Sequence, residues 1–140
     1  TTSDITSVNI DKNSEYVKVI DKYFQALNEK DAVKLVSLFP KNKNYTKENT
    51  ETQIRQMYAN YEATCGSNVK ISYEFSKAVE VKGETLESLK KQLANTYGIE
   101  TGISTIYSVE IYLIRTGDIS TQKDTIYLNL AKINDKWYIV

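Results

Sequence analysis

The chain has 140 residues, of which 41% are hydrophobic and 26% are charged, an ordinary composition for a globular protein. Its 18 basic residues balance its 18 acidic residues, which argues against electrostatic binding to nucleic acid. A chain of this length buries about 70% of the surface that it exposes when unfolded, so we expect one domain with its own hydrophobic core.

Histidine is absent from the sequence, and Cys65 is its single cysteine. These two facts exclude Ser-His-Asp and Cys-His catalysis, imidazole metal sites and a structural zinc site. Cys65 stands directly before Gly66, and we interpret it as a small apolar residue at the end of a helix rather than as a nucleophile. We predict no metal site and no cofactor.

Residues 1–13 are rich in Thr, Ser, Asp and Asn and show no periodicity, so we predict a polar tether before a single domain over residues 14–140. No apolar stretch is long enough to cross a bilayer. The chain begins with Thr1 rather than Met, and such a tether suits a secreted or lipid-anchored bacterial protein. We therefore expect an extracellular or cell-surface location, with membrane contact only through an N-terminal anchor that has been removed.

Apolar residues recur at helical spacing in three segments of the first half of the chain. A first helix with a broad apolar face is predicted over residues 14–27. Asp31 has the character of an N-cap for a second helix, which Pro40 ends. A third helix is predicted over residues 50–64, with Gly66 as its terminator.

The second half of the chain is dominated by strand patterns. Apolar and polar residues alternate from Val69 to Ser76, and this strand continues less regularly to Val81. Thr85 is expected to cap a short helix that Gly98 closes. Further strands are predicted over residues 104–115, 121–133 and 137–140.

Two of these strands carry matching apolar faces. The faces are Tyr107, Val109, Ile111 and Leu113 on one strand and Ile126, Leu128 and Leu130 on the next. The loop over residues 117–120 has an even length, which keeps both faces on the same side of an antiparallel sheet. A turn at Asn134 and Asp135, residue types that tolerate positive φ, then places Trp137 and Ile139 on this inner face.

The segment Tyr-Phe-Gln-Ala-Leu-Asn-Glu-Lys-Asp at residues 23–31, followed by Leu-Val-Ser-Leu-Phe at 35–39, resembles the opening helix pair of nuclear transport factor 2-like domains. The ending Lys-Ile-Asn-Asp-Lys-Trp-Tyr-Ile at 132–139 resembles their final hairpin, although Lys136 stands where those domains usually have glycine. The helix over residues 86–97, inserted between two long strands, resembles uncharacterised cell-surface lipoproteins of Gram-positive bacteria in this superfamily.

This resemblance implies an α+β fold in which N-terminal helices pack in a strongly curved antiparallel sheet. Such a cystatin-like or nuclear transport factor 2-like cone has a pocket at its open end. The superfamily includes ketosteroid isomerases, polyketide cyclases, dehydratases, nuclear transport factors and secretion-system assembly domains, so the fold leaves the function open. Its enzymes typically place Asp, Glu or His among the inward residues to move a proton.

No inward acid or base is visible in this sequence. Strand alternation turns Glu74 and Glu110 outward, and we interpret both as solvated carboxylates on the outer face of the sheet. The position of Asp31 is explained by helix capping. We therefore predict no catalytic residue.

The chain contains eleven tyrosines, and several could converge on the cone and orient a flat or apolar ligand. The alternative is that they are ordinary core residues whose hydroxyl groups reach the rim. The candidate pocket residues are Tyr23, Tyr58, Tyr61, Tyr73, Tyr107 and Trp137.

An apolar patch is predicted on the outer face of the sheet, where it would suit a protein partner or a homodimer. The alternative is that the long loops of the chain cover it. Its candidate interface residues are Ile106, Tyr112, Ile114, Tyr127 and Tyr138.

The first hypothesis is a non-enzymatic extracellular or surface-anchored domain that binds a small apolar or aromatic ligand or a protein partner. The alternative is an isomerase, cyclase or dehydratase that uses a tyrosine and a carboxylate. A one-residue slip in the strand over residues 104–115 would bring Glu110 inward and favour this alternative. A third possibility is an assembly subunit of a surface or conjugation apparatus.

Overall fold

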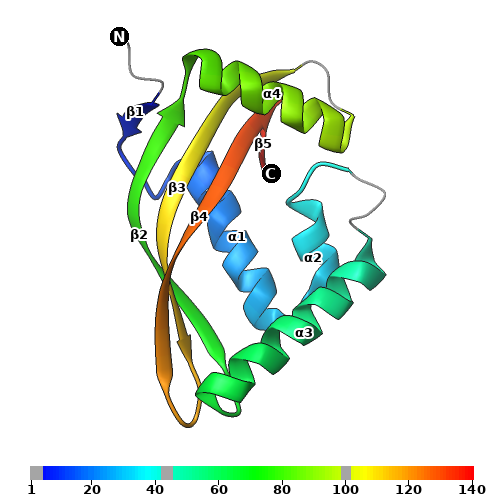
Figure 1. Cartoon of the computed structure of the whole chain (residues 1–140), viewed down its shortest axis with the longest axis vertical. Coiled ribbons are helices and arrows are strands. Elements are labelled where there is room, and N and C mark those ends of the chain that lie inside the picture. The colour runs from blue at the N-terminus through cyan, green and yellow to red at the C-terminus, as the bar shows by residue number, and fades with distance from the viewer. Residues whose placement is uncertain (1–4, 42–45, 99–101) are drawn as a thin grey trace.

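The computed structural model describes residues 5–41, 46–98 and 102–140, and within these ranges the chain forms one five-stranded antiparallel sheet with helices on both of its faces (Figure 1). The strands follow the order β1-β2-β3-β4-β5 in the sheet, so neighbours in the sequence are neighbours in space. The strands are β1 (Ile5–Val8), β2 (Lys70–Val81), β3 (Ile103–Thr116), β4 (Thr121–Ile133) and β5 (Lys136–Ile139). The helices are α1 (Glu15–Glu29), α2 (Ala32–Ser37), α3 (Lys47–Cys65) and α4 (Gly83–Tyr97).

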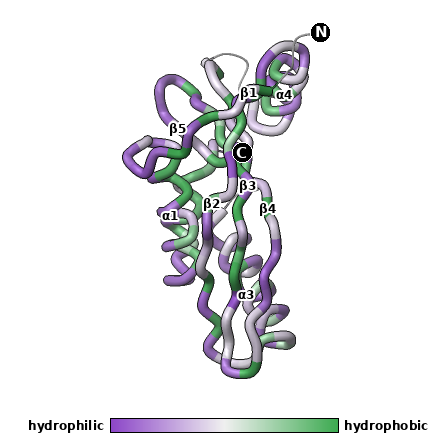
Figure 2. The backbone as a smooth tube through the Cα atoms, turned by 90° about the vertical axis from the view of Figure 1, so that its left-hand side faces the viewer, coloured by the Kyte–Doolittle hydropathy of each residue, from purple (hydrophilic) through white to green (hydrophobic). Residues whose placement is uncertain are grey.

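The predicted α+β architecture and the register of the long strands are confirmed. Ile111 pairs with Ile126 and Val109 with Leu128, as the matching apolar faces require. The turn between β4 and β5 has φ angles of 50° at Asn134 and 66° at Asp135, the positive values that a two-residue hairpin needs. Figure 2 shows the three long strands running side by side to the β3–β4 turn, with hydrophobic and hydrophilic residues alternating along them.

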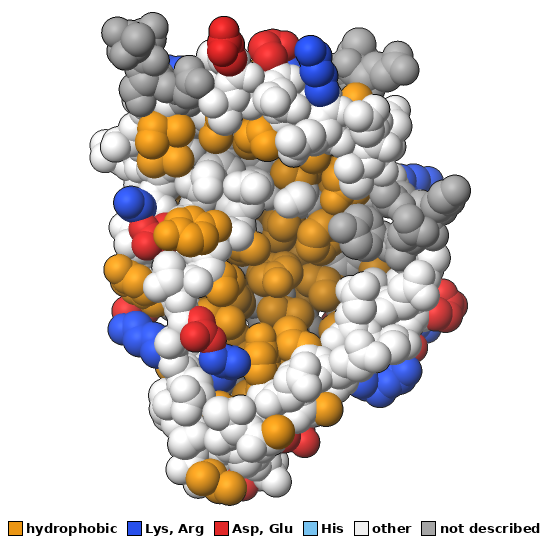
Figure 3. Space-filling view, viewed as in Figure 1, with side chains coloured by type: hydrophobic (Ala, Val, Ile, Leu, Met, Phe, Trp, Pro, Cys, Tyr) orange, Lys and Arg blue, Asp and Glu red, His pale blue; other side chains and the backbone are white. Residues whose placement is uncertain are grey.

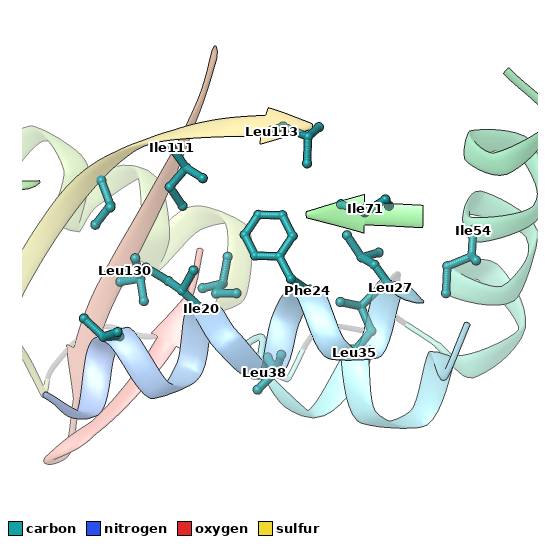
Figure 4. Close-up of a cluster of buried hydrophobic side chains, with 14 of the residues drawn as sticks. Ile20, Phe24, Leu27, Leu35, Leu38, Ile54, Ile71, Ile111, Leu113 and Leu130 are labelled. Carbon is teal, nitrogen blue, oxygen red and sulfur yellow. The ribbon is translucent and has the colours of Figure 1, made fainter. Parts of the chain in front are cut away.

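The core lies between α1 and the inner face of the sheet. Phe24 is 1% exposed, and its ring stacks on Tyr73 of β2 at 4.2 Å between centroids. Figure 4 shows Phe24 directed from α1 toward Leu113 and Ile71 of the sheet. The broad apolar face of α1 therefore fills the concave side of the sheet, while α2 packs on α1 from the other side.

An asparagine protects the part of the β2 edge that β1 leaves open. The side-chain amide of Asn28 donates to the Ile71 carbonyl at 2.7 Å, and its oxygen accepts from the Ile71 amide at 2.9 Å. These two bonds take the place of a neighbouring strand, because β1 pairs only with Ala78 to Val81. They also fix the C-terminal end of α1 against the sheet.

The polar composition of residues 1–13 predicts a tether, and this is wrong for Ile5–Val8. These residues form β1, which pairs antiparallel with β2, with Ile5 opposite Val81 and Val8 opposite Ala78. This edge strand is held by backbone hydrogen bonds to β2. Three of its four side chains are exposed, so its sequence shows little of the apolar–polar alternation by which a strand is recognised. Residues 1–4 lie outside the described ranges.

Helix α4 covers part of the outer face of the sheet, where the sequence predicts a surface for a protein partner. A second apolar cluster includes Ile106, which is 1% exposed, and Tyr138, which is partly buried. Their cover comes from α4, whose apolar side packs on the cluster. The prediction that Ile106 and Tyr138 belong to a partner interface is therefore corrected, because both residues pack beneath α4. The residues of α4 that pack here are Leu86, Leu89 and Leu93.

Farther along the outer face, Tyr112 and Ile114 are partly buried and Tyr127 is 64% exposed. A partner surface at these three residues stays a prediction. None of the helices in the described ranges is both long and apolar enough to span a membrane.

The cover by α4 can be tested by comparing two truncations on the outer face. Ile106→Ala should lower the free energy of unfolding by about 2–4 kcal/mol, because it removes a side chain buried beneath α4. Tyr127→Ala should lower it by less than about 1 kcal/mol, because this residue is largely in solvent. Urea unfolding measures both values. Equal losses for the two variants would contradict the packing of α4 on Ile106.

Candidate functional site

A cavity of about 160 Å³ lies between α1, α2 and α3. Figure 3 shows hydrophobic side chains gathered in a hollow at the centre of this face of the molecule. Each of the three helices contributes to the wall, so the cavity exists only because of how the helices are placed relative to one another. The lining residues are Tyr23, Leu27, Leu35, Val36, Phe39, Thr50, Gln53, Ile54 and Met57.

The C-terminal end of α3 is fixed to the turn between β3 and β4. The Cys65 carbonyl accepts backbone hydrogen bonds from Ile119 at 2.8 Å and from Ser120 at 3.1 Å. The Ser120 hydroxyl donates to the Thr64 carbonyl at 2.9 Å. At Gly117, a Cβ atom would lie only 2.5 Å from the Cys65 carbonyl oxygen, so this close approach requires glycine.

A second attachment joins α3 to α1. The buried hydroxyl of Tyr58 donates to the Leu27 carbonyl at 2.5 Å, near the C-terminal end of α1. The Leu27 carbonyl also accepts the backbone N–H of Lys30 at 3.2 Å, so the Tyr58 hydroxyl is a second donor to a carbonyl of the last helical turn. Together, the two attachments hold α3 across the space beside α1 without packing it along the whole length of the sheet.

The short connection between α1 and α2 determines how these two helices are placed relative to each other. Lys30 adopts a left-handed conformation with φ of 55°, which ends α1 and turns the chain. Asp31 then caps α2, since its carboxylate accepts the Lys34 backbone N–H at 3.0 Å. The predicted capping role of Asp31 is confirmed. The tight turn brings Leu35 of α2 back toward Leu27 of α1.

Among the described residues, nine line the cavity, and none of these nine carries a charge. Polar groups come from the hydroxyls of Tyr23 and Thr50 and from the amide of Gln53, which is exposed. Thr50 is only 5% exposed. Burial raises the pKa of the Tyr23 phenol, and the neighbouring Tyr61 raises this pKa further. The cavity is therefore a neutral, apolar space with hydroxyl groups in its wall.

The aromatic residues predicted to line one pocket are distributed over separate groups. Tyr107 and Trp137 lie against each other at 4.9 Å, together with Tyr16 near the start of α1. Tyr73 stacks on Phe24 in the core. These groups are apart because Tyr16 and Tyr23 are about two helical turns from each other on α1.

Of the six predicted pocket residues, Tyr23 lines the cavity between the helices. Tyr58 and Tyr61 lie on α3, with Tyr58 serving the hydrogen bond to α1 and Tyr61 packed beneath the Arg115 guanidinium at 4.6 Å. The participation of the six residues in binding a ligand stays a prediction.

The apolar lining from α2 and α3 was missed as a site because the sequence assigns these residues to the core. A signal was present in the third helix, whose apolar stripe is narrow for a helix of 19 residues. Such a helix buries only part of its surface, and Met57 stays partly exposed at the cavity wall. A long helix with a narrow stripe is where an open cavity could have been expected.

The two carboxylates considered from the sequence, Glu74 and Glu110, lie on β2 and β3 and are not among the described lining residues. Glu110 is opposite Tyr127 on the outer face and forms an ion pair with Lys77 at 3.6 Å, so its predicted outward direction is confirmed. Glu74 is exposed. Within the described residues, no group of three or more acidic or cysteine side chains is placed to hold a metal ion.

One tyrosine–carboxylate pair exists at the junction of α1 and β2. The Tyr73 hydroxyl donates to the exposed carboxylate of Asp21. Burial raises the pKa of Tyr73, and this hydrogen bond raises it further. A phenol with a raised pKa is a weaker proton donor, and neither residue lines the cavity, so the pair serves to join helix and sheet.

No family model matches the chain, and no curated protein matches it either. Among solved structures, a protein of unknown function with a cystatin-like fold from Nostoc punctiforme is similar at a TM-score of 0.52 and 15% identity, over 90% of this chain and 84% of that one. The beta subunit of benzoate 1,2-dioxygenase from Burkholderia mallei is similar at a TM-score of 0.54 and 6% identity, over 95% and 89% of the two chains.

At these identities the likeness concerns the fold alone. The chain has the cystatin-like α+β fold that its sequence predicts. The resemblance to Gram-positive lipoproteins receives no support from these neighbours and stays a prediction.

The buried tyrosines predict a loss of stability at alkaline pH. Burial is the first cause of a raised pKa in Tyr16, Tyr23, Tyr58, Tyr61, Tyr73 and Tyr107. The unfolded chain therefore loses these phenolic protons at lower pH than the folded chain, and the free energy of unfolding should fall as the pH rises through about 10.

Urea unfolding of the wild type and of Tyr73→Phe at a series of pH values tests this expectation. The variant should show the smaller fall, since it lacks the phenol with the largest shift. Identical pH profiles for the two proteins would contradict the assignment of the raised pKa to Tyr73.

Proposed function

We propose that this chain is a non-enzymatic binding domain that takes a small apolar or aromatic molecule into the cavity between α1, α2 and α3. The observation that carries the proposal is the uncharged lining of this cavity. Apolar molecules gain free energy by leaving water for such a surface, and preformed apolar concavities with few polar groups are typical ligand sites.

The position of Glu110 supports binding over catalysis. An isomerase or cyclase of the kind considered above needs a carboxylate or another base within reach of the bound molecule. The strand register turns Glu110 to the outer face, where Lys77 pairs with it. In the part of the chain that the structure describes, the residues that line the cavity include no carboxylate.

A protein-binding role is a second candidate, and the exposed Tyr127 is the observation that favours it. A homodimer or an assembly contact would use the outer face beyond α4, at Tyr112, Ile114 and Tyr127. Native mass spectrometry of gently purified protein separates the two roles, because it reports the subunit number and any retained small molecule together.

An extracellular or surface-anchored location in a Gram-positive bacterium is also proposed. It is supported by the resemblance of the helix over residues 86–97 to the corresponding helix of cell-surface lipoproteins. The genomic reading frame tests it. A start codon directly upstream with no apolar segment would contradict it.

Filling the cavity tests ligand binding directly. Toluene at ten times its Kd should raise the melting temperature of the wild type by about 4 °C, since a ligand that binds only the folded state stabilises it. Met57→Trp places a larger side chain at the cavity wall and should abolish this rise. Differential scanning calorimetry with and without toluene measures the effect.

Met57→Leu is the matched control, because it keeps the apolar character and the approximate volume of the side chain. It should retain at least half of the toluene effect. Circular dichroism checks that both variants fold. A wild type that toluene does not stabilise, or a Met57→Trp variant that it stabilises as much as the wild type, would contradict the proposed function.

A further inference from the structure

The volume of the cavity matches an occupant of about one ring. An apolar protein cavity of roughly 150 Å³ stays dry and binds benzene. The cavity described above measures about 160 Å³ and is lined by side chains of the same kind, such as Leu27, Leu35 and Ile54. A single ring with a small substituent fits within this volume, whereas a fused-ring or steroid skeleton would extend out of the cavity into solvent.

The lining also disfavours a charged ring compound. A carboxylate in the cavity would lose its hydration without meeting a cation from the described part of the wall, because none of the lining residues described there is charged. Two cations form cation–π contacts with aromatic rings of α3. The Lys30 ammonium lies 4.5 Å from the centre of the Tyr58 ring. The Arg115 guanidinium lies over the ring of Tyr61. Arg115 is additionally paired with Asp124. The neutral form of a ligand is therefore the form that binds.

A hydroxyl group in the wall supplies a specific polar contact. The Tyr23 side chain is partly buried at the cavity wall, and none of the hydrogen bonds among the described residues uses its hydroxyl group. Its raised pKa keeps the phenol protonated at neutral pH, so it can donate as well as accept. Thr50 adds a second hydroxyl-bearing side chain to the wall, on the facing helix α3. A hydroxyl in an otherwise apolar wall favours a ligand that hydrogen-bonds to it over one that displaces its water without replacing that bond.

We infer that the cavity selects an uncharged, single-ring aromatic molecule that carries one hydroxyl group, a ligand of the phenol class, with Tyr23 as the residue that recognises this group. The inference rests on the proposed function, because it names the ligand class of the same cavity. It goes beyond that function in predicting which of several molecules of equal size is bound best.

Three probes of similar shape test the inference by isothermal titration calorimetry at neutral pH: p-cresol, toluene and 4-methylbenzoate. For the wild type, p-cresol should bind about tenfold more tightly than toluene, the effect of one buried hydrogen bond. 4-Methylbenzoate should bind at least about tenfold more weakly than p-cresol, because its charge is buried without a partner.

The variant Tyr23→Phe removes the hydroxyl and keeps the ring. Its affinity for p-cresol should fall about five- to tenfold, while its affinity for toluene should stay within about twofold of the wild type. Tyr107→Phe is the matched control, since it removes a hydroxyl from a tyrosine that does not line the cavity. It should bind all three probes as the wild type does.

The outcomes separate this inference from the function on which it rests. Toluene and p-cresol binding with equal affinity, tightest binding of 4-methylbenzoate, or an unchanged p-cresol affinity in Tyr23→Phe would each overturn the phenol class while leaving apolar binding intact. Failure of all three probes to bind the wild type would overturn the proposed function and this inference together.

Discussion

The close contact between the end of α3 and the β3–β4 turn is the constraint on which the rest of the structure depends. The two segments meet with no room for a side chain at Gly117, and two turn amides bind the Cys65 carbonyl. Because α3 is fixed at this turn and is also bound to α1 through Tyr58, its middle part lies beside the core without packing fully against it. The cavity is the space that this arrangement leaves, and its apolar walls are the faces that would otherwise have packed together.

The sheet and α1 could be predicted from the sequence because their signals are local and periodic. Residues 104–133 alternate with a period of two, and the even loop between the strands determines which side chains share a face. The cover by α4 could not be predicted in this way. Ile106 and Val109 lie on opposite faces of one strand, both are apolar, and both are buried, so alternation alone does not show what lies above each face.

The narrow apolar stripe of α3 hints at an open cavity, but the dimensions of the cavity could not be predicted, for a related physical reason. Apolar spacing shows that Leu35 and Ile54 face inward, but the distance between two helices depends on contacts made elsewhere, such as that of Cys65 with the turn. The tyrosines illustrate the same limit. The number of tyrosines suggested one aromatic pocket. Their positions on different elements instead separate Tyr107 on β3 from Tyr23 on α1. Tyr107 packs against Tyr16 and Trp137.

Methyl NMR of isotopically labelled protein tests most directly whether the space between the helices is a binding site. Addition of toluene should shift the methyl resonances of Leu27, Leu35 and Ile54, which line the cavity. The methyls of Leu89 and Ile106, in the separate cluster beneath α4, should keep their positions. Shifts concentrated at Leu89 and Ile106, with none at the cavity, would contradict the account.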